Sequence, residues 1–432
     1  MRQKRTKMIK LLSTMAIVVM LVFGMIMPAL AADYSEGTEA NPARGAITKK
    51  LQMPAETVTP TATFSFAFAK KDLDGSTSAP DLALMPTLGP ITVSFAAADV
   101  GTTAAGIKTV SKESANFVAG AVWPRAGVYT YTVTETAGTY TLNATPPPTE
   151  TMVYSQAVYE VEVWVANSAT PGGAPWVHYI VSKSITTDTG GTGGGAKEDP
   201  TPGGDGTTYF ESQMIFMNTY TKRNGGPDPE DPNDEVFRLS KVVSGTMADQ
   251  TRYFSFSVTV NSPAVGVAPN ATYVGYVVEN VAGTPTVVTS AANYAGTISA
   301  AGGISFTAGT PLTILLKHGQ RLVFTDLYVG SSFTVTEAAA ADYTPSYVLT
   351  LNNVAGAAVN GVKNTALTAP SSGVAYLGEL TNIAAFTNTH DMVTPTGIAV
   401  DNLPYYALFS MAVIAFILFV LIKARRNAKY RA

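Results

Sequence analysis

The chain has 432 residues, few charges and no cysteine. Lysine, arginine, aspartate and glutamate make up 14% of it, well below the roughly 25% of an average domain. The net charge of −3 gives no sign of a nucleic-acid partner, and an exported protein without cysteine cannot be cross-linked by disulfides.

The first 31 residues predict a secretory signal peptide. A basic region precedes an apolar stretch at 11–27, and Ala29-Leu30-Ala31 has the small side chains of a cleavage site. Cleavage there would make the exported chain begin at about Ala32; the alternative is an uncleaved membrane anchor.

A polar segment, residues 223–235, divides the exported part into two comparable halves, residues 45–222 and 236–391. Its central part contains three prolines and no apolar residue to bury, so we expect a stiffened linker. The exported part is long enough for two domains.

Both halves alternate apolar and polar residues, in runs such as TATFSFAF, VYTYTVTE and RYFSFSVTV. β-Branched and aromatic residues at a period of two predict strands, and we find no convincing amphipathic helix between the two ends of the chain. The expected architecture is all-β, with two tandem immunoglobulin-like β-sandwich domains.

One glycine-rich stretch, residues 189–206, is not expected to form a strand. Its sequence, TGGTGGGAKEDPTPGGDG, does not fit a phosphate-binding loop, because Lys197 is followed by Glu198 rather than by serine or threonine. We expect a flexible surface loop.

The two halves share three landmarks in the same order: a lysine on the first strand, the tetrapeptide Thr-Val-Thr-Glu, and the tetrapeptide Phe-x-Asn-Thr. They supply Lys49, Glu135 and Asn218 in the first half, and Lys241, Glu337 and Asn388 in the second. Strand alternation puts each of these residues on the same face as large apolar side chains, whereas Lys50 points the opposite way from Lys49. If those faces are the core, three polar groups are buried in each half, which is costly unless they satisfy one another.

Such a buried trio has a known use in chemistry. Burial lowers the pKa of a lysine and raises that of a glutamate, which gives a neutral amine and a protonated acid. The amine can attack the asparagine carbonyl while the carboxyl group carries a proton to the departing ammonia. The product is a Lys–Asn isopeptide bond that joins the first strand of the domain to its last.

The C-terminus combines three elements. Pro395-Thr396-Gly397 lies in a segment at 392–404, an apolar stretch follows at 405–422, and residues 423–432 are rich in lysine and arginine. The apolar stretch is about the minimum for a transmembrane helix, and the basic residues behind it predict a cytoplasmic tail.

This order resembles the cell-wall sorting signal of Gram-positive surface proteins, which a sortase cleaves between threonine and glycine, here Thr396 and Gly397. The three landmarks are similar to those of isopeptide-forming domains in Gram-positive pilins and adhesins. The first half resembles the streptococcal-type pilin isopeptide linkage domain in RAGVYTYTVTETAGTY and MIFMNTYTK, and the second resembles a related pilin repeat in LKHGQRLVFTDLYVGSSFTVTE and AAFTNTH. The resemblance implies the pairs Lys49–Asn218, with Glu135 as catalyst, and Lys241–Asn388, with Glu337 as catalyst.

Two departures from the family pattern leave details open. Its sorting motif is Leu-Pro-x-Thr-Gly, whereas here proline directly precedes threonine, so the sortase class is open. Backbone pilins also offer a lysine, often after Tyr-Pro, to the next subunit. The nearest counterpart here is Trp123-Pro124-Arg125, and arginine cannot serve, so Lys183 and Lys197 stand as candidates.

We therefore expect a structural surface protein, a pilin subunit or a wall-anchored adhesin, and not an enzyme. Expected partners are a sortase, other pilin subunits or peptidoglycan, and a host surface ligand; no cofactor is expected. No metal site is expected either, because His178, His318 and His390 are far apart in the sequence. One alternative is a wall-anchored receptor or surface enzyme, for which no third domain or catalytic motif is found. The other is an uncleaved single-pass membrane protein, which detergent would extract.

Overall fold

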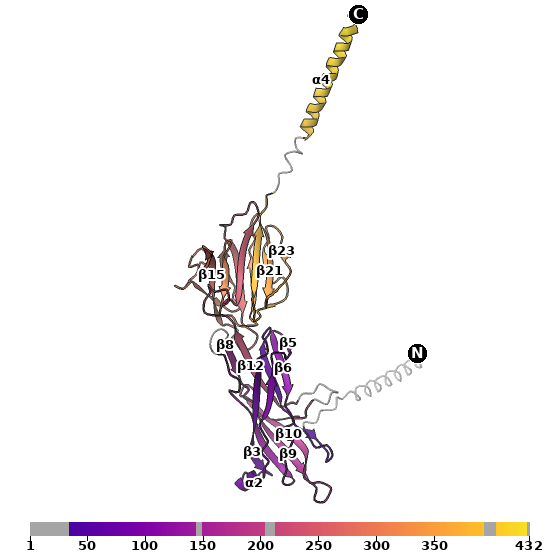
Figure 1. Ribbon diagram of the computed structural model, residues 1–432, viewed down its shortest axis with the longest axis vertical. Helices are drawn as coiled ribbons and strands as arrows, with labels where there is room; N and C mark the ends of the chain where they lie inside the picture. Colours follow the sequence, from indigo (N-terminus) through magenta and orange to yellow (C-terminus); the bar gives the residue numbers. More distant parts are fainter. Residues whose placement is uncertain (1–33, 144–148, 204–211, 393–402, 430–432) are drawn as a thin grey trace, which may run out of the picture.

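A computed structural model describes residues 34–143, 149–203, 212–392 and 403–429 (Figure 1). The predicted signal peptide and the Pro395-Thr396-Gly397 motif lie outside these residues. Two helices are described, α2 (Ala79–Leu84) and the C-terminal α4 (Leu403–Lys429), and strands form the two domains between the ends of the chain. The prediction of an all-β protein with a C-terminal apolar helix is confirmed.

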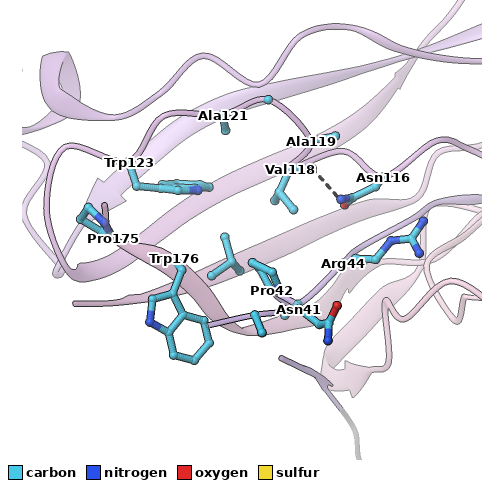
Figure 2. Close-up of a pocket in the computed structure, with 14 residues that line it drawn as sticks. Asn41, Pro42, Arg44, Asn116, Val118, Ala119, Ala121, Trp123, Pro175 and Trp176 are labelled. Atoms are coloured by element: carbon cyan, nitrogen blue, oxygen red, sulfur yellow. Dashed lines mark hydrogen bonds between the residues drawn. The ribbon is translucent and has the colours of Figure 1, made fainter. Parts of the chain in front are cut away.

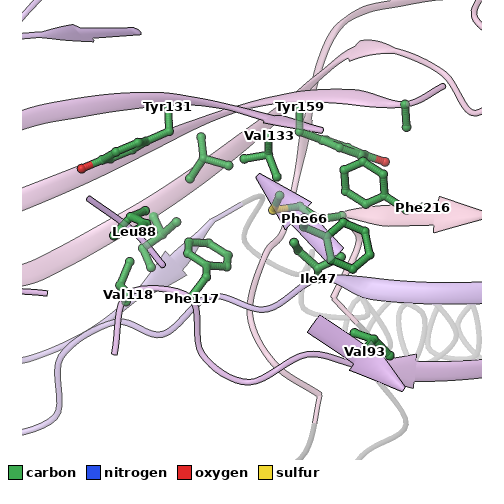
Figure 3. Packing of buried hydrophobic residues seen from close by; sticks show 14 of the residues in the cluster. Ile47, Phe66, Leu88, Val93, Phe117, Val118, Tyr131, Val133, Tyr159 and Phe216 are labelled. Atoms are coloured by element: carbon green, nitrogen blue, oxygen red, sulfur yellow. The ribbon is translucent and has the colours of Figure 1, made fainter. Parts of the chain in front are cut away.

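The first domain encloses one hydrophobic core between two sheets (Figure 3). The core includes Phe66 and Phe216, whose rings lie 5.0 Å apart between centroids. The larger sheet contains, in spatial order, β1 (Ser35–Glu36), β10 (Trp176–Thr186), β9 (Val158–Ala166), β7 (Gly127–Thr136), β3 (Ala62–Leu73) and β4 (Ile91–Phe95), with β11 (Thr192–Glu198) also paired to β10. The smaller sheet contains β5 (Thr102–Ala104), β6 (Ile107–Glu113), β2 (Thr48–Pro54), β12 (Ile215–Arg223) and β8 (Thr149–Val153).

The second domain has its own core, also between two sheets. The larger sheet contains β16 (Thr284–Val287), β15 (Thr272–Val281), β19 (Arg321–Phe324), β13 (Phe237–Ser244), β26 (Ile383–Thr389), β21 (Thr344–Leu351) and β22 (Val354–Ala355), with β17 (Gly303–Thr307) paired to β15 and β23 (Val359–Asn360) to β21. The smaller sheet contains β18 (Leu312–Leu316), β14 (Phe254–Asn261), β20 (Ser332–Glu337) and β24 (Leu367–Ala369), with β25 (Ala375–Tyr376) paired to β20.

The sequence repeat is also a repeat of strand pairing. In each domain the landmark lysine strand and the landmark asparagine strand are parallel neighbours, β2 with β12 and β13 with β26. Their registers agree, because Lys49 lies opposite Phe216 and Lys241 lies opposite Phe386. The landmark lysine and the landmark asparagine therefore have the same relative position in both domains.

The domains lie end to end (Figure 1), and their junction is held by hydrogen bonds around Glu379. Its carboxylate accepts from the backbone N–H of Val58 at 2.8 Å and from Lys222 Nζ at 2.6 Å. Its backbone oxygen accepts from Asn224 Nδ2 at 2.6 Å. Nearby, Arg223 donates to the hydroxyl of Tyr328 at 2.9 Å.

Residues 223–235, the predicted linker, are hydrogen-bonded within the segment and to the second domain. Gly226 donates its N–H to the backbone oxygen of Asp234 at 3.2 Å, which closes the segment into a loop. Glu230 accepts from the backbone N–H of Val287 at 2.8 Å. Acidic side chains of the segment also accept from its own backbone, Asp228 from the N–H of Glu230 at 2.8 Å and Asp234 from the N–H of Asp228 at 2.9 Å.

The prediction of a loop over residues 189–206 is wrong in part. Strand β11 occupies Thr192–Glu198, because the backbone of residues 182–186 in β10 supplies hydrogen-bonding partners that require no side-chain pattern. The short helix α2 was also not predicted. It begins after Ser78, whose hydroxyl accepts from Asp81 N, and it buries no residue completely, so it carries no amphipathic signal.

Helix α4 extends beyond the predicted span of 405–422. Its segment Pro404–Arg426 is long and apolar enough to cross a membrane, and the helix continues through the first seven residues of the predicted basic tail, 423–429. The apolar stretch of this segment is not buried against the rest of the chain, so both domain cores are complete without the helix.

Candidate functional site

The first candidate site lies between the sheets of the first domain. Lys49 on β2 and Asn218 on β12 project from the smaller sheet, and Glu135 at the end of β7 reaches them from the larger sheet. Glu135 lies opposite Phe66 in the strand register, and the ring centroid of Phe64 is 4.7 Å from Lys49 Nζ. Alternating strands thus bring the three polar groups into an aromatic pocket.

The Glu135 carboxyl group bridges the other two side chains. Its Oε2 lies 2.8 Å from Lys49 Nζ, and its Oε1 accepts from Asn218 Nδ2 at 2.7 Å. The side chains of Lys49 and Glu135 have no exposed surface, and neither has Asn218. The residues that sequence reasoning selected are therefore in direct contact.

The carbonyl oxygen of Asn218 has a partner that sequence reasoning did not identify. The backbone N–H of Ser155 donates to Asn218 Oδ1 at 2.7 Å. A backbone donor in a loop depends on chain geometry and leaves no residue pattern, so no sequence signal could have identified it.

The second candidate site repeats the trio with the sheets exchanged. Lys241 on β13 and Asn388 on β26 lie in the larger sheet of the second domain, and Glu337 on β20 faces them from the smaller one. Glu337 Oε1 is 2.6 Å from Lys241 Nζ and accepts from Asn388 Nδ2 at 2.7 Å. All three are at most 1% exposed, and the ring centroid of Phe254 is 4.3 Å from the amine.

Two oxygens of this second site lack a hydrogen-bond donor among the described residues, Glu337 Oε2 and Asn388 Oδ1. Unpaired buried acceptors are costly, by roughly 1–3 kcal/mol each. A proton on the Glu337 carboxyl group would turn one of its acceptors into a donor. The surroundings therefore favour the acid form.

Burial shifts the pKa values of the lysine and the glutamate in the same way in both sites. It lowers the pKa of Lys49 and of Lys241 to about 8, with the neighbouring carboxylate acting in the opposite sense. It raises the pKa of Glu135 and of Glu337 above the ordinary glutamate value. Each site is therefore biased toward a neutral amine beside a protonated acid.

The other predicted residues lie apart from the trios. Thr396 and Gly397 fall outside the described residues. Lys183 pairs with Glu162, whereas Lys197 is exposed and its side chain has no hydrogen-bonding or ionic partner in the described chain.

No group of three or more metal-binding side chains occurs among the described residues. A surface hollow of about 450 Å³ is lined by Trp123 and Trp176, among others (Figure 2), and it includes no member of either trio.

Both domains match models of known protein families. Residues 46–221 match the family described as Spy0128-like isopeptide containing domain, and residues 237–389 match a domain of unknown function (DUF7601). The pilus tip adhesin Cpa of Streptococcus pyogenes is 27% identical over 196 residues, which are 45% of this chain and 22% of the adhesin. The chain thus spans about a fifth of the length of that relative.

Solved structures of streptococcal pilins are also similar. The major pilin of Streptococcus pyogenes is 18% identical, with a TM-score of 0.29 over 82% of this chain and 100% of the pilin. The T3.2 major pilin of the same species is 17% identical, with a TM-score of 0.29 over 84% of this chain and 100% of the pilin. The first domain thus matches the model of the Spy0128-like isopeptide containing domain over residues 46–221, and 45% of the chain is similar to a streptococcal pilus tip adhesin.

Proposed function

We propose that this chain is a structural cell-surface protein, a pilin subunit or wall-anchored adhesin, whose two domains each form a Lys–Asn isopeptide bond without an external enzyme. The proposed bonds are Lys49–Asn218 and Lys241–Asn388. The observation that supports this best is the buried trio, found twice, with contacts of 2.6–2.8 Å from each carboxyl group to the amine and to the amide.

In the first domain the neutral Lys49 Nζ attacks Cγ of Asn218, and the Nζ–Cγ bond forms as the carbonyl electrons move to Oδ1. Glu135 lies beside both nitrogens, so it can accept a proton from Nζ through Oε2 and deliver one to Nδ2 through Oε1. The Cγ–Nδ2 bond then breaks and ammonia leaves. The carboxyl group ends in its starting state, and each bond costs the chain one ammonia.

Burial favours both the reaction and its product. The lowered lysine pKa supplies the unprotonated nucleophile, and the raised glutamate pKa supplies the acid. The product replaces a buried ionisable amine with a neutral amide, which removes the cost of burying a charge on that amine.

The mass of the exported chain tests this proposal. Residues 32–392, which contain both cores, should weigh about 34 Da less than their sequence, the mass of two ammonia molecules. Apart from the mass of the substitution itself, Glu135→Ala should regain about 17 Da, with only the second cross-linked peptide left in a tryptic digest, and Glu337→Ala the converse. A parent mass equal to that of the uncorrected sequence refutes the two bonds.

We further propose that sortase cleaves between Thr396 and Gly397 and joins Thr396 to an amine of another subunit or of peptidoglycan. The apolar helix α4 supports this, because it would hold the motif close to the membrane, where a membrane-bound transpeptidase acts. If the acceptor is a lysine of this chain, Lys197 is better suited than Lys183, whose amine is engaged by Glu162.

Deletion of residues 395–397 tests the sortase step. The deleted protein should stay full-length in the membrane fraction, where detergent extracts it, whereas muramidase should release the parent from the wall. A wall-linked product that survives the deletion contradicts this cleavage site. Loss of a polymer ladder in Lys197→Arg, but not in Lys183→Arg, would identify the acceptor; the reverse result would favour Lys183.

A further inference from the structure

A second carboxylate lies behind the first trio. Asp188, just after β10, accepts at a single oxygen, Oδ1, from the backbone N–H of Met217 at 2.8 Å and from the hydroxyl of Ser155. Its backbone oxygen accepts from Gln156 N at 3.0 Å. None of the three sequence landmarks includes Asp188 or Ser155.

These contacts join the two groups that control the carbonyl of Asn218. Met217 precedes Asn218 on β12, and Ser155 supplies the N–H that donates to Asn218 Oδ1 at 2.7 Å. One oxygen of Asp188 therefore holds the strand that carries the amide and the loop that carries its donor. The Ser155 hydroxyl also accepts from Ala157 N at 3.1 Å, which fixes the loop further.

We propose that Asp188 is a positioning residue that holds the Ser155 N–H as an oxyanion donor for formation of the first cross-link. The inference rests on the proposed function. When Lys49 Nζ attacks Cγ, negative charge develops on Oδ1, and a donor already aimed at that atom stabilises the transition state. The electron pair on Oδ1 then re-forms the carbonyl, the Cγ–Nδ2 bond breaks, and Nδ2 leaves as ammonia with the proton that Glu135 delivers.

The second site lacks this device among the described residues, because Asn388 Oδ1 has no hydrogen-bond donor there. The two sites otherwise share the lysine, the glutamate and the aromatic surroundings. We therefore expect the first bond to form faster than the second in the same molecule. The second bond also serves as an internal control for any change made at Asp188.

Position and charge can be separated because both side-chain hydrogen bonds end on the same oxygen. Asp188→Asn keeps an oxygen acceptor for Met217 and Ser155 and removes the charge, whereas Asp188→Ala removes both. If position matters, the asparagine variant should form the first bond within about twofold of the parent rate, and the alanine variant should be slower by at least about tenfold. The second bond should form at the parent rate in both.

The measurement uses residues 32–392 made by cell-free synthesis, quenched at intervals and digested, so that each cross-linked peptide is quantified separately. Equal slowing in both variants, or an unchanged rate in Asp188→Ala, overturns the proposal. If Asp188→Ala does not fold, Ser155→Ala removes the hydroxyl tie while keeping the backbone N–H, and it should also slow the first bond. An unchanged first-bond rate in Ser155→Ala overturns the proposal too. A parent without either cross-link refutes the proposed function itself, which distinguishes that failure from failure of this inference.

Discussion

Preventing the second cross-link should cost the second domain a large part of its stability. Glu337→Gln keeps the size of the side chain but removes the proton carrier beside Lys241 and Asn388. Without it the ends of a loop of about 150 residues stay unjoined, and the chain-entropy relation assigns such a loop at most about 5 kcal/mol. Measured cross-links often deliver less, so we expect a loss of about 3–5 kcal/mol, a large fraction of the stability of an ordinary domain.

For a domain of this size, that loss corresponds to a fall in melting temperature of about 10–15 °C. Calorimetry of residues 32–392 should show a lowered second transition and an unchanged first one. Intact mass, higher by about 17 Da apart from the substitution, verifies that the bond is missing.

Asn388→Ala is the matched control, because it also prevents the bond but retains the contact between Lys241 and Glu337. Both variants should lose a similar amount of stability if the cross-link is responsible. A fall of less than about 3 °C in both, with the bond absent, would refute the entropy argument. A fall confined to Glu337→Gln would assign the stability to the buried pair instead.

Three further predictions concern pH and the domain junction. Formation of both bonds should slow above about pH 8, the pKa of the two lysines. In the reactive state each lysine–glutamate pair holds one proton, on the glutamate, and above this pH the pair loses that proton, so the glutamate can no longer deliver it. A rate that still rises above pH 8 contradicts this assignment. In Asn388→Ala, the free energy of unfolding should rise between pH 8 and 10. The pKa of Lys241 is about 8 in the folded chain and has the ordinary lysine value of 10.5 in the unfolded chain, so the unfolded chain binds more protons in this range. This rise should vanish in the double variant with Lys241→Met. Glu379→Ala should loosen the junction by about 1–3 kcal/mol and broaden the interdomain distances seen by small-angle scattering without changing the mass lost to cross-linking. Gly330→Ala should also broaden the interdomain distances, because the added Cβ would lie 2.3 Å from the Cβ of Pro54 in the first domain. Unchanged scattering in both variants would show that these contacts do not hold the domains together.

The cores and the two trios could be anticipated because both depend on alternation along strands. A period of two determines which side chains share a face, and it correctly grouped Lys49 with the buried apolar residues. Alternation does not determine which strands pair. The assignment of lysine and asparagine to one sheet and glutamate to the other therefore had to come from the structure.

The features missed in the sequence depend on the backbone. Strand β11 is rich in glycine and has no apolar period, and it exists because β10 offers it hydrogen-bonding partners. Asp188 and Ser155 act on β12 from a strand end and a loop, so neither has a fixed spacing from Asn218 that a motif could capture.

The position of the last strand links cross-linking to correct strand register. In each domain this strand lies inside a sheet, β12 between β2 and β8, and β26 between β13 and β21. Neither sheet is complete until the end of the domain has arrived. A slip of one residue would turn Asn218 or Asn388 to the opposite face, out of reach of its lysine. If the proposed bonds form, only a correctly paired last strand would be locked by one, so the cross-linked fraction of a preparation would count the molecules that folded in register.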